Sequence, residues 1–464
     1  SSAEIKSAEA TSMETIDVAG WINSRQVSAL QIVVLILCAA AAALEGFDTQ
    51  NIGYVAPAII REWHSPPHDF TIVFVSGLIG LLIGCLVVAP LADWFGRRRV
   101  LIGTATMFGI LSLATVSAHS VLSLCIFRFF TDLALAGGMA NAIAMTSEYF
   151  PARMRAWMTV VMFCGFPLGA SLGGFVAAAI IPSYGWRLVF VIGGILPLIL
   201  ATCLATFLPE SIRHLVVSGA DVAKISAILH RIDPRSEFPA HARFVMAADQ
   251  PLAGLTVKHL FTEQRALGTV LIWIVFFMSL LDIFLLTSWL PEVLHDAGFS
   301  ISASAIATAA LQGSGVIGSL AIGPLLDRRG CLTALLPMYV LAAAGIAGIG
   351  SAGVAFPLIL LASCGAGVGV VTGQNTANAF AAIFYPTSIR ATGVGWALGI
   401  GRFGAIVGPI IGGIMLGLHF SRPMIFGIGA IPSVIAALAV FGLMRLERAK
   451  RIAPPPAGKP LSAH

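Results

Sequence analysis

Long apolar stretches recur along most of this 464-residue chain, each bounded by glycine, proline or charged residues. About 20 consecutive apolar residues are enough for a helix to cross the hydrocarbon core of a bilayer. Twelve stretches fit this description, so the pattern predicts an all-α polytopic membrane protein with twelve transmembrane helices. The predicted spans are Gln31–Ala58, Thr71–Leu91, Val100–Ala118, Val121–Met145, Trp157–Ile181, Trp186–Leu208, Ala266–Leu290, Ser302–Leu326, Leu332–Gly350, Ala355–Ala381, Thr392–Leu418 and Pro423–Leu443.

An internal repeat relates the two halves of the chain. The segment Leu91–Arg99 returns as Leu326–Gly330, and Tyr149–Ala156 returns as Phe384–Ala391. Equivalent positions in the paired segments are 234 or 235 residues apart. Two parallel six-helix halves are typical of transporters whose substrate site lies between the halves at mid-membrane. We therefore predict two pseudo-symmetric six-helix bundles.

One long polar stretch, between the sixth and seventh predicted spans, divides the chain. We expect it to be a linker, because none of the other connections is comparably long. The predicted organisation is a cytoplasmic N-terminal tail (1–29), an N-terminal six-helix bundle (30–208), a cytoplasmic linker loop (209–265), a C-terminal six-helix bundle (266–445) and a cytoplasmic C-terminal tail (446–464).

The composition supports a membrane protein and sets its orientation. Hydrophobic residues make up 58% of the chain and charged residues only 11%, against roughly a quarter charged in soluble domains. Eight arginines lie in short loops on one predicted side and three on the other, which places the first side, both termini and the linker in the cytoplasm of a bacterial inner membrane. The eight are Arg97, Arg98, Arg99, Arg153, Arg155, Arg328, Arg329 and Arg390, and the three are Arg61, Arg187 and Arg422.

Several other classes of function lack support in the sequence. The seven cysteines fall in or beside apolar runs without a CxxC spacing, so neither a disulfide framework nor a metal site is expected. No Walker motif follows the sixth span, and the ten histidines are scattered. Basic residues form no patch interleaved with aromatic side chains. We predict no enzyme activity, no cofactor and no nucleic-acid partner.

Two carboxylates, Glu45 and Asp48, interrupt the first predicted span. An ionisable group at mid-membrane costs about 2.5–3.5 kcal/mol on insertion scales, so such groups tend to face a cavity or a partner. The spacing of three places both on one helical face. Neighbouring carboxylates resist simultaneous ionisation, so we expect one to hold a proton, as a proton-coupled carrier requires. The alternative is a hydrogen-bonded pair that only packs helices.

Three further ionisable residues lie within predicted spans. Adding the repeat offset of 234 to Asp48 gives Asp282, which predicts two acids facing one cavity; alternatively, Asp282 bonds locally and takes no part in transport. Arg128 and Asp132 are four residues apart and could form an ion pair, either static or part of proton coupling.

Arg402, in the eleventh span, has no acid near it in sequence. Its guanidinium could bind a substrate carboxylate with two hydrogen bonds, or pair with Glu45, Asp48 or Asp282. The tenth span carries Gln374, Asn375 and Asn378. Gln374 and Asn378 share a helical face and could bind substrate, although buried amides also commonly join helices.

Three aromatic residues lie next to these polar positions in sequence: Phe47, Phe166 and Trp396. Each could stack on an aromatic ring of a substrate. Ordinary packing is the alternative, because the chain contains 28 phenylalanines.

Several motifs together resemble the major facilitator superfamily. Asp93…Gly96-Arg97-Arg98 is similar to its cytoplasmic loop motif, and Glu45-Gly-Phe-Asp48 and Phe384-Tyr-Pro-Thr resemble its aromatic acid:proton symporter family. That family usually has Asp where this chain has Glu45, and Asp282 is unusual for it. The resemblance implies that Arg128 takes part in proton coupling. It also implies a latch that closes the inner gate, formed by Asp93, Arg97, Arg98, Glu148, Arg153, Asp327, Arg328 and Arg390.

Together these observations predict a proton-coupled symporter, acting as a monomer, that imports a small aromatic carboxylate of the benzoate or hydroxybenzoate class by alternating access. Substrate-binding residues would be Arg402, Asp48, Glu45, Gln374, Asn378, Asp282, Phe47, Phe166 and Trp396, and proton coupling would use Glu45, Asp48, Arg128 and Asp132. The alternatives are a proton-coupled carrier of a muconate-type acid, a sugar or a drug, and a membrane receptor that does not transport.

Overall fold

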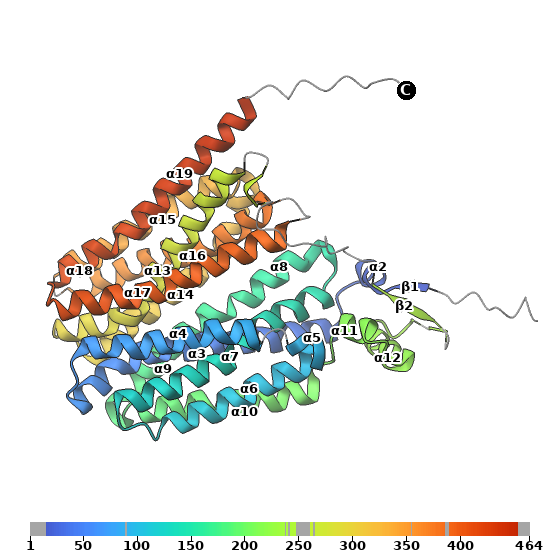
Figure 1. Cartoon of the computed structure of the whole chain (residues 1–464), viewed down its shortest axis with the longest axis horizontal. Helices are drawn as coiled ribbons and strands as arrows, with labels where there is room; N and C mark the ends of the chain where they lie inside the picture. The colour runs from blue at the N-terminus through green and yellow to red at the C-terminus, as the bar shows by residue number, and fades with distance from the viewer. Residues whose placement is uncertain are drawn as a thin grey trace, which may run out of the picture. The chain divides into compact units, whose positions relative to one another are not determined.

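The computed structural model describes residues 15–88, 91–236, 238–239, 242–246, 260–262, 265–353, 355–385 and 389–452, apart from the side chains of 93, 156, 323–329, 390–391 and 449–452. Long helices dominate these residues (Figure 1). Eleven helical spans among them are long and apolar enough to cross a membrane. The remaining predicted span, Val100–Ala118, corresponds to a helix at Arg97–Thr115 that is not among the eleven because it begins with three arginines.

The chain divides into two compact units, which are described separately below. Unit 1 comprises Ser1–Ser65 and Ile72–Pro251, and unit 2 comprises Pro66–Thr71 and Leu252–His464. The elements of unit 1 are β1 (Thr15–Asp17), α2 (Val18–Asn23), α3 (Ala29–Trp63), α4 (Phe70–Val87), α5 (Leu91–Phe95), α6 (Arg97–Thr115), α7 (Val121–Tyr149), α8 (Ala152–Phe163), α9 (Gly165–Tyr184), α10 (Arg187–Phe207), α11 (Ile212–Val217), α12 (Val222–Ile232) and β2 (Arg243–Val245).

Unit 2 is helical throughout its described residues. The short segment Pro66–Thr71 also belongs to unit 2. Its Thr71 side chain packs against Gly413, which has no side chain of its own. Its elements are η1 (Pro67–Asp69), α13 (Ala266–Asp296), α14 (Ile301–Arg329), α15 (Cys331–Ser351), α16 (Phe356–Phe384), α17 (Arg390–Gly417), α18 (Arg422–Gly429) and α19 (Ile431–Ile452).

The helix α3 is longer than a bilayer is thick and has well-defined ends. Ser28 caps its N-terminus and forms a capping box with Gln31, while His64 ends it in the left-handed conformation at φ 51°. Its 35 residues span about 52 Å at 1.5 Å per residue, against a hydrocarbon core of about 30 Å. The helix therefore reaches beyond the membrane.

Glycines allow helices to come close together in each unit. On α9, a Cβ at Gly169 would lie 1.8 Å from the carbonyl oxygen of Ala43 on α3. On α17, a Cβ at Gly404 would lie 2.1 Å from the carbonyl oxygen of Phe277 on α13. Ala43 and Phe277 are 234 residues apart and the two glycines 235, so the repeat seen in the sequence is also a repeat of contacts. Small residues at such crossings let the backbones approach closely.

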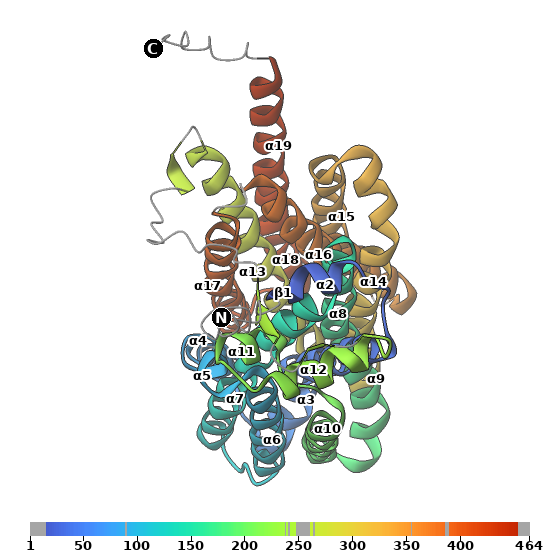
Figure 2. The ribbon, with the colours of Figure 1, turned by 90° about the vertical axis from the view of Figure 1, so that its right-hand side faces the viewer.

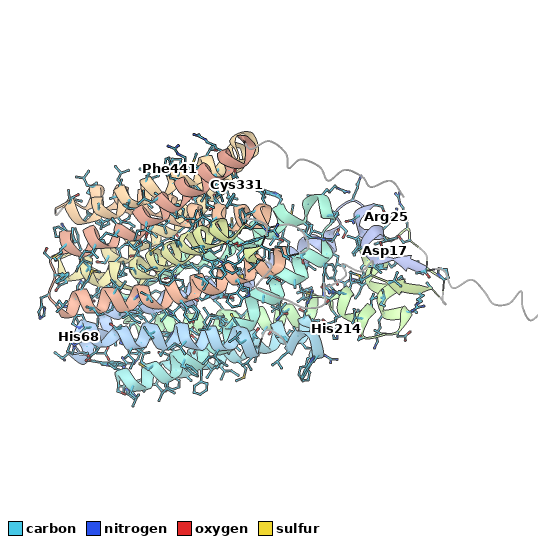
Figure 3. The ribbon with its side chains drawn as sticks, turned by 45° about the horizontal axis from the view of Figure 1, so that its top comes forward. Asp17, Arg25, His68, His214, Cys331 and Phe441 are labelled. Atoms are coloured by element: carbon cyan, nitrogen blue, oxygen red, sulfur yellow. The ribbon has the colours of Figure 1, made fainter. Side chains whose placement is uncertain are left out.

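Parts of the predicted tail and linker fold together in unit 1. Strand β1 pairs in parallel with β2, and Asp17 caps α2 by accepting hydrogen bonds from the backbone N–H groups of Ala19 and Gly20. Figure 1 shows β1, α2, α11, α12 and β2 at one end of unit 1, Figure 2 turns β1, α2, α11 and α12 toward the viewer, and Figure 3 labels Asp17, Arg25 and His214 there. We call these five elements the tail–linker layer.

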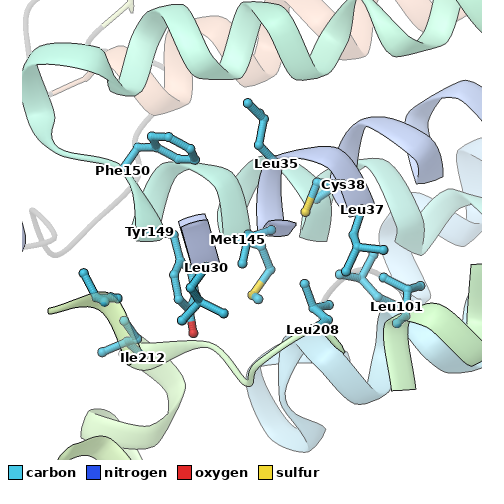
Figure 4. Close-up of a cluster of buried hydrophobic side chains, with 14 of the residues drawn as sticks. Leu30, Leu35, Leu37, Cys38, Leu101, Met145, Tyr149, Phe150, Leu208 and Ile212 are labelled. Carbon is cyan, nitrogen blue, oxygen red and sulfur yellow. The ribbon is translucent and has the colours of Figure 1, made fainter. Parts of the chain in front are cut away.

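Apolar packing joins the tail–linker layer to the helices of unit 1. Buried side chains from the layer, including Val18, Ile22, Ile225 and Leu229, belong to the same hydrophobic cluster as the starts and ends of α3, α6, α7 and α10. Figure 4 shows part of this cluster, around Tyr149. The layer is therefore a packed part of unit 1, which the sequence pattern alone does not indicate.

Candidate functional site

A buried cluster of charged residues joins α3 to α7 within unit 1. Nη1 of Arg128 donates to Oδ2 of Asp48 at 2.9 Å, and Nη2 donates to Oδ1 of Asp132 at 2.7 Å. Nη2 also approaches the backbone carbonyl of Asp48 at 3.4 Å. The side chains are 2%, 0% and 7% exposed for Arg128, Asp48 and Asp132. One guanidinium thus bridges two carboxylates in the interior of an apolar bundle.

Glycines make room for the acids of this cluster. A Cβ at Gly77 of α4 would lie only 2.1 Å from Oδ2 of Asp132, so the carboxylate occupies space that any other residue there would fill. Glu45, which is buried, lies one turn before Asp48 on α3, and its Oε2 is 3.6 Å from the Cβ position of Gly138 on α7. Three acids and Arg128 therefore lie where α3 packs against α7. We call Glu45, Asp48, Arg128 and Asp132 the α3–α7 cluster.

Acids outnumber bases in the α3–α7 cluster. Three ionised carboxylates and one guanidinium would leave two negative charges, and Oδ1 of Asp48 has no hydrogen-bond partner. A buried charge is tolerated only when it is paired and hydrogen-bonded; otherwise the group is neutralised by taking up a proton. A proton on an acid in contact with Arg128 would change the strength of its ion pair.

Part of this geometry follows from the sequence. The Arg128–Asp132 ion pair, expected from their spacing of four, is present. The contact of Arg128 with Asp48, 80 residues away along the chain, was not predicted. The signal for it was the opposite sign of two mid-span charges, each of which needed a partner. The roles of Glu45, Asp48, Arg128 and Asp132 in coupling stay predictions.

The polar residues predicted for the C-terminal half lie in unit 2. Asp282 of α13 is fully buried and accepts a hydrogen bond from the hydroxyl of Ser433 on α19. On α16, Nε2 of Gln374 donates to Oδ1 of Asn378 at 3.0 Å, which confirms that the two share a face. Nδ2 of Asn375 donates to Ser319 of α14 at 2.8 Å and so joins two helices. Substrate contacts by these groups stay predictions.

Arg402 lies on α17, and its surroundings differ from those of Arg128. Its side chain is half-buried, and within the described residues it forms neither an ion pair nor a hydrogen bond. Pairing with Asp282, one of the alternatives left by the sequence, is absent among the described residues of unit 2, and pairing with Glu45 or Asp48 of unit 1 is untested. An unpaired guanidinium is available to bind an anion.

The three candidate aromatic residues have distinct surroundings. The ring of Phe47 packs between Gly173 and Gly193. Its atoms lie 3.0 Å from where a Cβ at Gly173 would be and 3.1 Å from where a Cβ at Gly193 would be. Phe166 is half-buried. Trp396 is 44% exposed and stacks on Trp273 with ring centres 5.9 Å apart. Phe47 thus packs within unit 1, and stacking of any of the three on a substrate is untested.

Residues predicted for the cytoplasmic latch form contacts within unit 1. Arg97, the first residue of α6, forms an ion pair with Glu148 near the end of α7. Glu148 also accepts a hydrogen bond from the hydroxyl of Ser211 at 2.5 Å. The backbone N–H of Arg98 donates to Glu210 at 3.0 Å. Glu210 and Ser211 stand just after α10, and the sequence analysis did not identify them.

Arg153 contacts the N-terminal segment rather than an acid. Its two terminal nitrogens donate to the backbone carbonyls of Asn23 at 2.9 Å and Arg25 at 2.8 Å. These bonds tie the start of α8 to the tail–linker layer. The other predicted latch residues have side chains that lie outside the described residues: Asp93, Asp327, Arg328 and Arg390.

Within the described residues, no group of three or more His, Cys, Asp or Glu side chains is arranged to hold a metal ion. The absence of a cofactor stays an expectation.

Comparison with known proteins places the chain in a family. The profile of the Major Facilitator Superfamily matches residues 38–402. The chain is 37% identical over 442 residues to the gallate transporter of Pseudomonas putida, covering 95% of this chain and 98% of that one. It is 38% identical over 431 residues to the 4-hydroxybenzoate transporter PcaK of the same organism, covering 92% and 95%. These relatives are named as transporters, in agreement with the prediction of a transporter rather than an enzyme.

Solved structures share the fold at lower identity. A D-xylose-proton symporter superimposes with a TM-score of 0.68 at 17% identity, covering 88% of this chain and 97% of the other. A bacterial homolog of the human lysosomal transporter Spinster gives 0.65 at 18% identity, covering 93% and 100%. The predicted fold class is confirmed. The chain belongs to the major facilitator superfamily, in the family that includes these gallate and 4-hydroxybenzoate transporters.

Proposed function

We propose that the protein is a symporter that carries a small aromatic carboxylate, of the hydroxybenzoate class, together with protons into the cell. The substrate class is supported by the relatives that are 37–38% identical and named for gallate and 4-hydroxybenzoate. Coupling to protons is supported by the α3–α7 cluster. The single observation that carries the proposal is the surplus of buried carboxylates around Arg128.

The α3–α7 cluster would take up the coupling protons. With its acids ionised, the cluster holds unbalanced negative charge, and the protein then pays a large desolvation cost to close around it. Protonation of Glu45 or Asp48 lowers that cost. Protonation of Asp48 also weakens its bond to Arg128, which otherwise ties α3 to α7. Proton binding would thus be linked to the stability of the closed form.

The substrate carboxylate would bind to Arg402. This guanidinium is half-buried on α17 and has no protein partner within the described residues. A planar guanidinium matches the two oxygens of a carboxylate. Gln374 and Asn378, hydrogen-bonded to each other, would bind ring hydroxyl groups, because an amide can both donate and accept.

Transport would proceed by alternating access in the inner membrane, with the termini and the linker on the cytoplasmic side. The latch pair Arg97–Glu148 would hold the cytoplasmic end closed during part of the cycle. Co-transport of more protons than substrate charges moves positive charge inward. Each such charge gains about 2.3 kcal/mol per 100 mV of membrane potential.

Uptake by purified protein in proteoliposomes tests this proposal. With the outside made acidic, labelled 4-hydroxybenzoate should accumulate inside, and collapse of the pH gradient with a protonophore should abolish accumulation. Unlabelled gallate, benzoate, muconate, xylose and a lipophilic drug serve as competitors. Competition by the aromatic acids alone supports the substrate class. Binding of label without accumulation under any gradient would contradict transport, and accumulation unchanged by the protonophore would contradict proton coupling.

A further inference from the structure

Asp282 is a buried acid outside the α3–α7 cluster. Its side chain, at mid-span on α13 in unit 2, is 0% exposed. Oδ2 accepts a hydrogen bond from Ser433, whereas Oδ1 is buried and has no hydrogen-bond partner. No described residue forms an ion pair with it. An acid in this position needs another way to avoid the cost of a buried charge.

The repeat shows what unit 2 lacks. Helices α7 and α16 are both 29 residues long and begin 235 positions apart, at Val121 and Phe356. The same offset places Ser363 at the position of Arg128 and Gly367 at the position of Asp132. Ser363 is fully buried, with a hydroxyl that has no hydrogen-bond partner. Unit 2 thus keeps the equivalent of Asp48 but has neither the equivalent arginine nor the second acid.

The missing second acid has a packing reason. A Cβ at Gly367 would lie 1.8 Å from the carbonyl oxygen of Leu311 on α14. No side chain fits there while α14 and α16 keep their contact. The corresponding place in unit 1 instead has room for the carboxylate of Asp132, because Gly77 has no side chain to fill it.

Asp282 contacts one hydroxyl group and has another near it. Besides Ser433, the buried hydroxyls of Ser279, one turn earlier on α13, and Tyr339 of α15 lie nearby, and Tyr339 is close enough to interact electrostatically with Asp282. The ring of Tyr339 packs against Gly373 of α16. Hydroxyls can donate or accept, so they can accommodate either a protonated or an ionised carboxyl group.

Among the described side chains of the neighbouring helices, no cation compensates Asp282. Helix α16 has no Asp, Glu, Lys, Arg or His, and α15 has none either; its Tyr339 lies near Asp282. Arg402 of α17 forms no ion pair with a described residue. Arg422 of α18 donates to the carbonyl of Gly353. Arg445 of α19 is twelve residues beyond Ser433, which is about 18 Å along the helix. On α14 the charged residues are those at 327–329, whose side chains lie outside the described part. On α13 itself, the next acid is ten residues away.

We propose that Asp282 is a second proton-binding site, located in unit 2 and independent of the α3–α7 cluster. In this conformation the carboxyl group is neutral: Oδ1 carries the proton, and Oδ2 accepts the hydrogen bond from Ser433. The proton comes from water and returns to water, with no other bond made or broken. Loading and release of this proton during the cycle would add one proton to those carried by unit 1. Only this transport consequence rests on the proposed function.

Infrared difference spectroscopy of the purified full-length protein tests the protonation directly. At neutral pH, the spectrum of wild type minus Asp282→Asn should show the C=O stretch of a protonated carboxyl group, which shifts in D2O. Asp296→Asn, which removes an exposed acid from the same helix, should show no such band. Ser433→Ala should shift the band to higher frequency rather than remove it, because the carbonyl loses a hydrogen bond.

Absence of the band overturns the proposal. Loss of the band when sodium chloride is added at constant ionic strength also overturns it, and would indicate a sodium site instead. The measurement needs no substrate, so it stands even if no aromatic acid is transported. In proteoliposomes, Asp282→Asn should lower the proton-to-substrate ratio by one, and an unchanged ratio would contradict release of this proton during the cycle. Monodisperse gel-filtration profiles for both variants exclude misfolding as the cause.

Discussion

The two units carry a buried aspartate at equivalent places, Asp48 on α3 and Asp282 on α13, yet the two acids have different partners. Asp48 pairs with Arg128, which also holds Asp132, whereas Asp282 bonds to a serine hydroxyl. One helix contact repeats in both units, with a glycine against a backbone carbonyl at equivalent positions. The repeat thus keeps this packing contact while the charges near the two acids differ.

The shared packing predicts the largest effect. Gly169→Val and Gly404→Val should each prevent stable folding, because the new side chain would collide with the backbone of α3 or α13. Overpacking of this kind costs about 3 kcal/mol or more. The yield and thermal stability of detergent-solubilised protein measure the loss. Gly103→Ala and Gly399→Ala, at positions with open space around the Cβ, are the controls. Normal stability of either valine variant would contradict the contact that both units share.

The difference in charge predicts the next effect. Arg128→Met should lower gradient-driven accumulation at least tenfold and destabilise the protein by about 3–5 kcal/mol, because it leaves buried acids without their cation. Ser363→Ala, at the equivalent position in unit 2, should change both quantities little. Adding Asp48→Asn and Asp132→Asn to Arg128→Met should restore stability but not accumulation. Equal losses for Arg128→Met and Ser363→Ala would show that the units do not differ as described.

A third prediction separates anion binding from proton binding. Arg402→Ala should weaken the binding of aromatic carboxylates about tenfold or more, since a hydrogen bond to a charged group contributes about 1.5–3 kcal/mol. Binding of the corresponding amides should change much less. Titration calorimetry with 4-hydroxybenzoate and 4-hydroxybenzamide measures both affinities. Equal losses for acid and amide would remove Arg402 as the carboxylate ligand.

The smallest effect concerns the tail–linker layer, which only unit 1 has among the described residues. The backbone N–H of Arg235, with smaller contributions from Ser236 and then from the Arg25 guanidinium at 3.3 Å, holds the pKa of Asp233 below its ordinary value. Because the pKa is lower in the folded state, these contacts stabilise the layer at pH values above the ordinary pKa of about 3.9. The stabilisation is lost as the pH falls through the lowered pKa. Hydrogen exchange in α2 should therefore rise slightly in acid.

Asp233→Asn should remove that part of the acid response, and salt should weaken it because the pair is exposed. An identical acid response in wild type and Asp233→Asn would mean that the contact contributes nothing to the layer.

The sequence predicts the fold well because its strongest signals are local or periodic. Apolar runs locate the spans, and motifs at a constant offset locate the repeat. The repeat also placed Asp282, but the serine that bonds to it stands 151 residues later on α19, where nothing marks it as different from other serines. Likewise, the spacing of Arg128 and Asp132 predicted their pair, whereas the bond to Asp48 depends on how α3 packs against α7.

The tail–linker layer was missed for a related reason. Strands of three residues and a helix of 6 residues give little periodic signal, and their stability comes from burial against unit 1. Helix α12 does carry a signal, because Ile225, Leu229 and Ile232 recur at helical spacing and share its buried face, but the sequence analysis did not use it. The family resemblance assigned Arg153 to the latch, and in the structure it donates to backbone carbonyls, which carry no sequence signature.

Proton flux during substrate entry tests the central claim most directly. Proteoliposomes holding a pH-sensitive dye receive 4-hydroxybenzoate with no gradient imposed, and internal acidification is recorded together with uptake of label. Wild type should acidify the interior as substrate enters. Asp48→Asn should still equilibrate substrate while the acidification beyond passive acid entry disappears, with Asp69→Asn, an exposed acid, behaving as wild type. Undiminished acidification per substrate in Asp48→Asn would contradict a coupling role for the buried acid of the α3–α7 cluster.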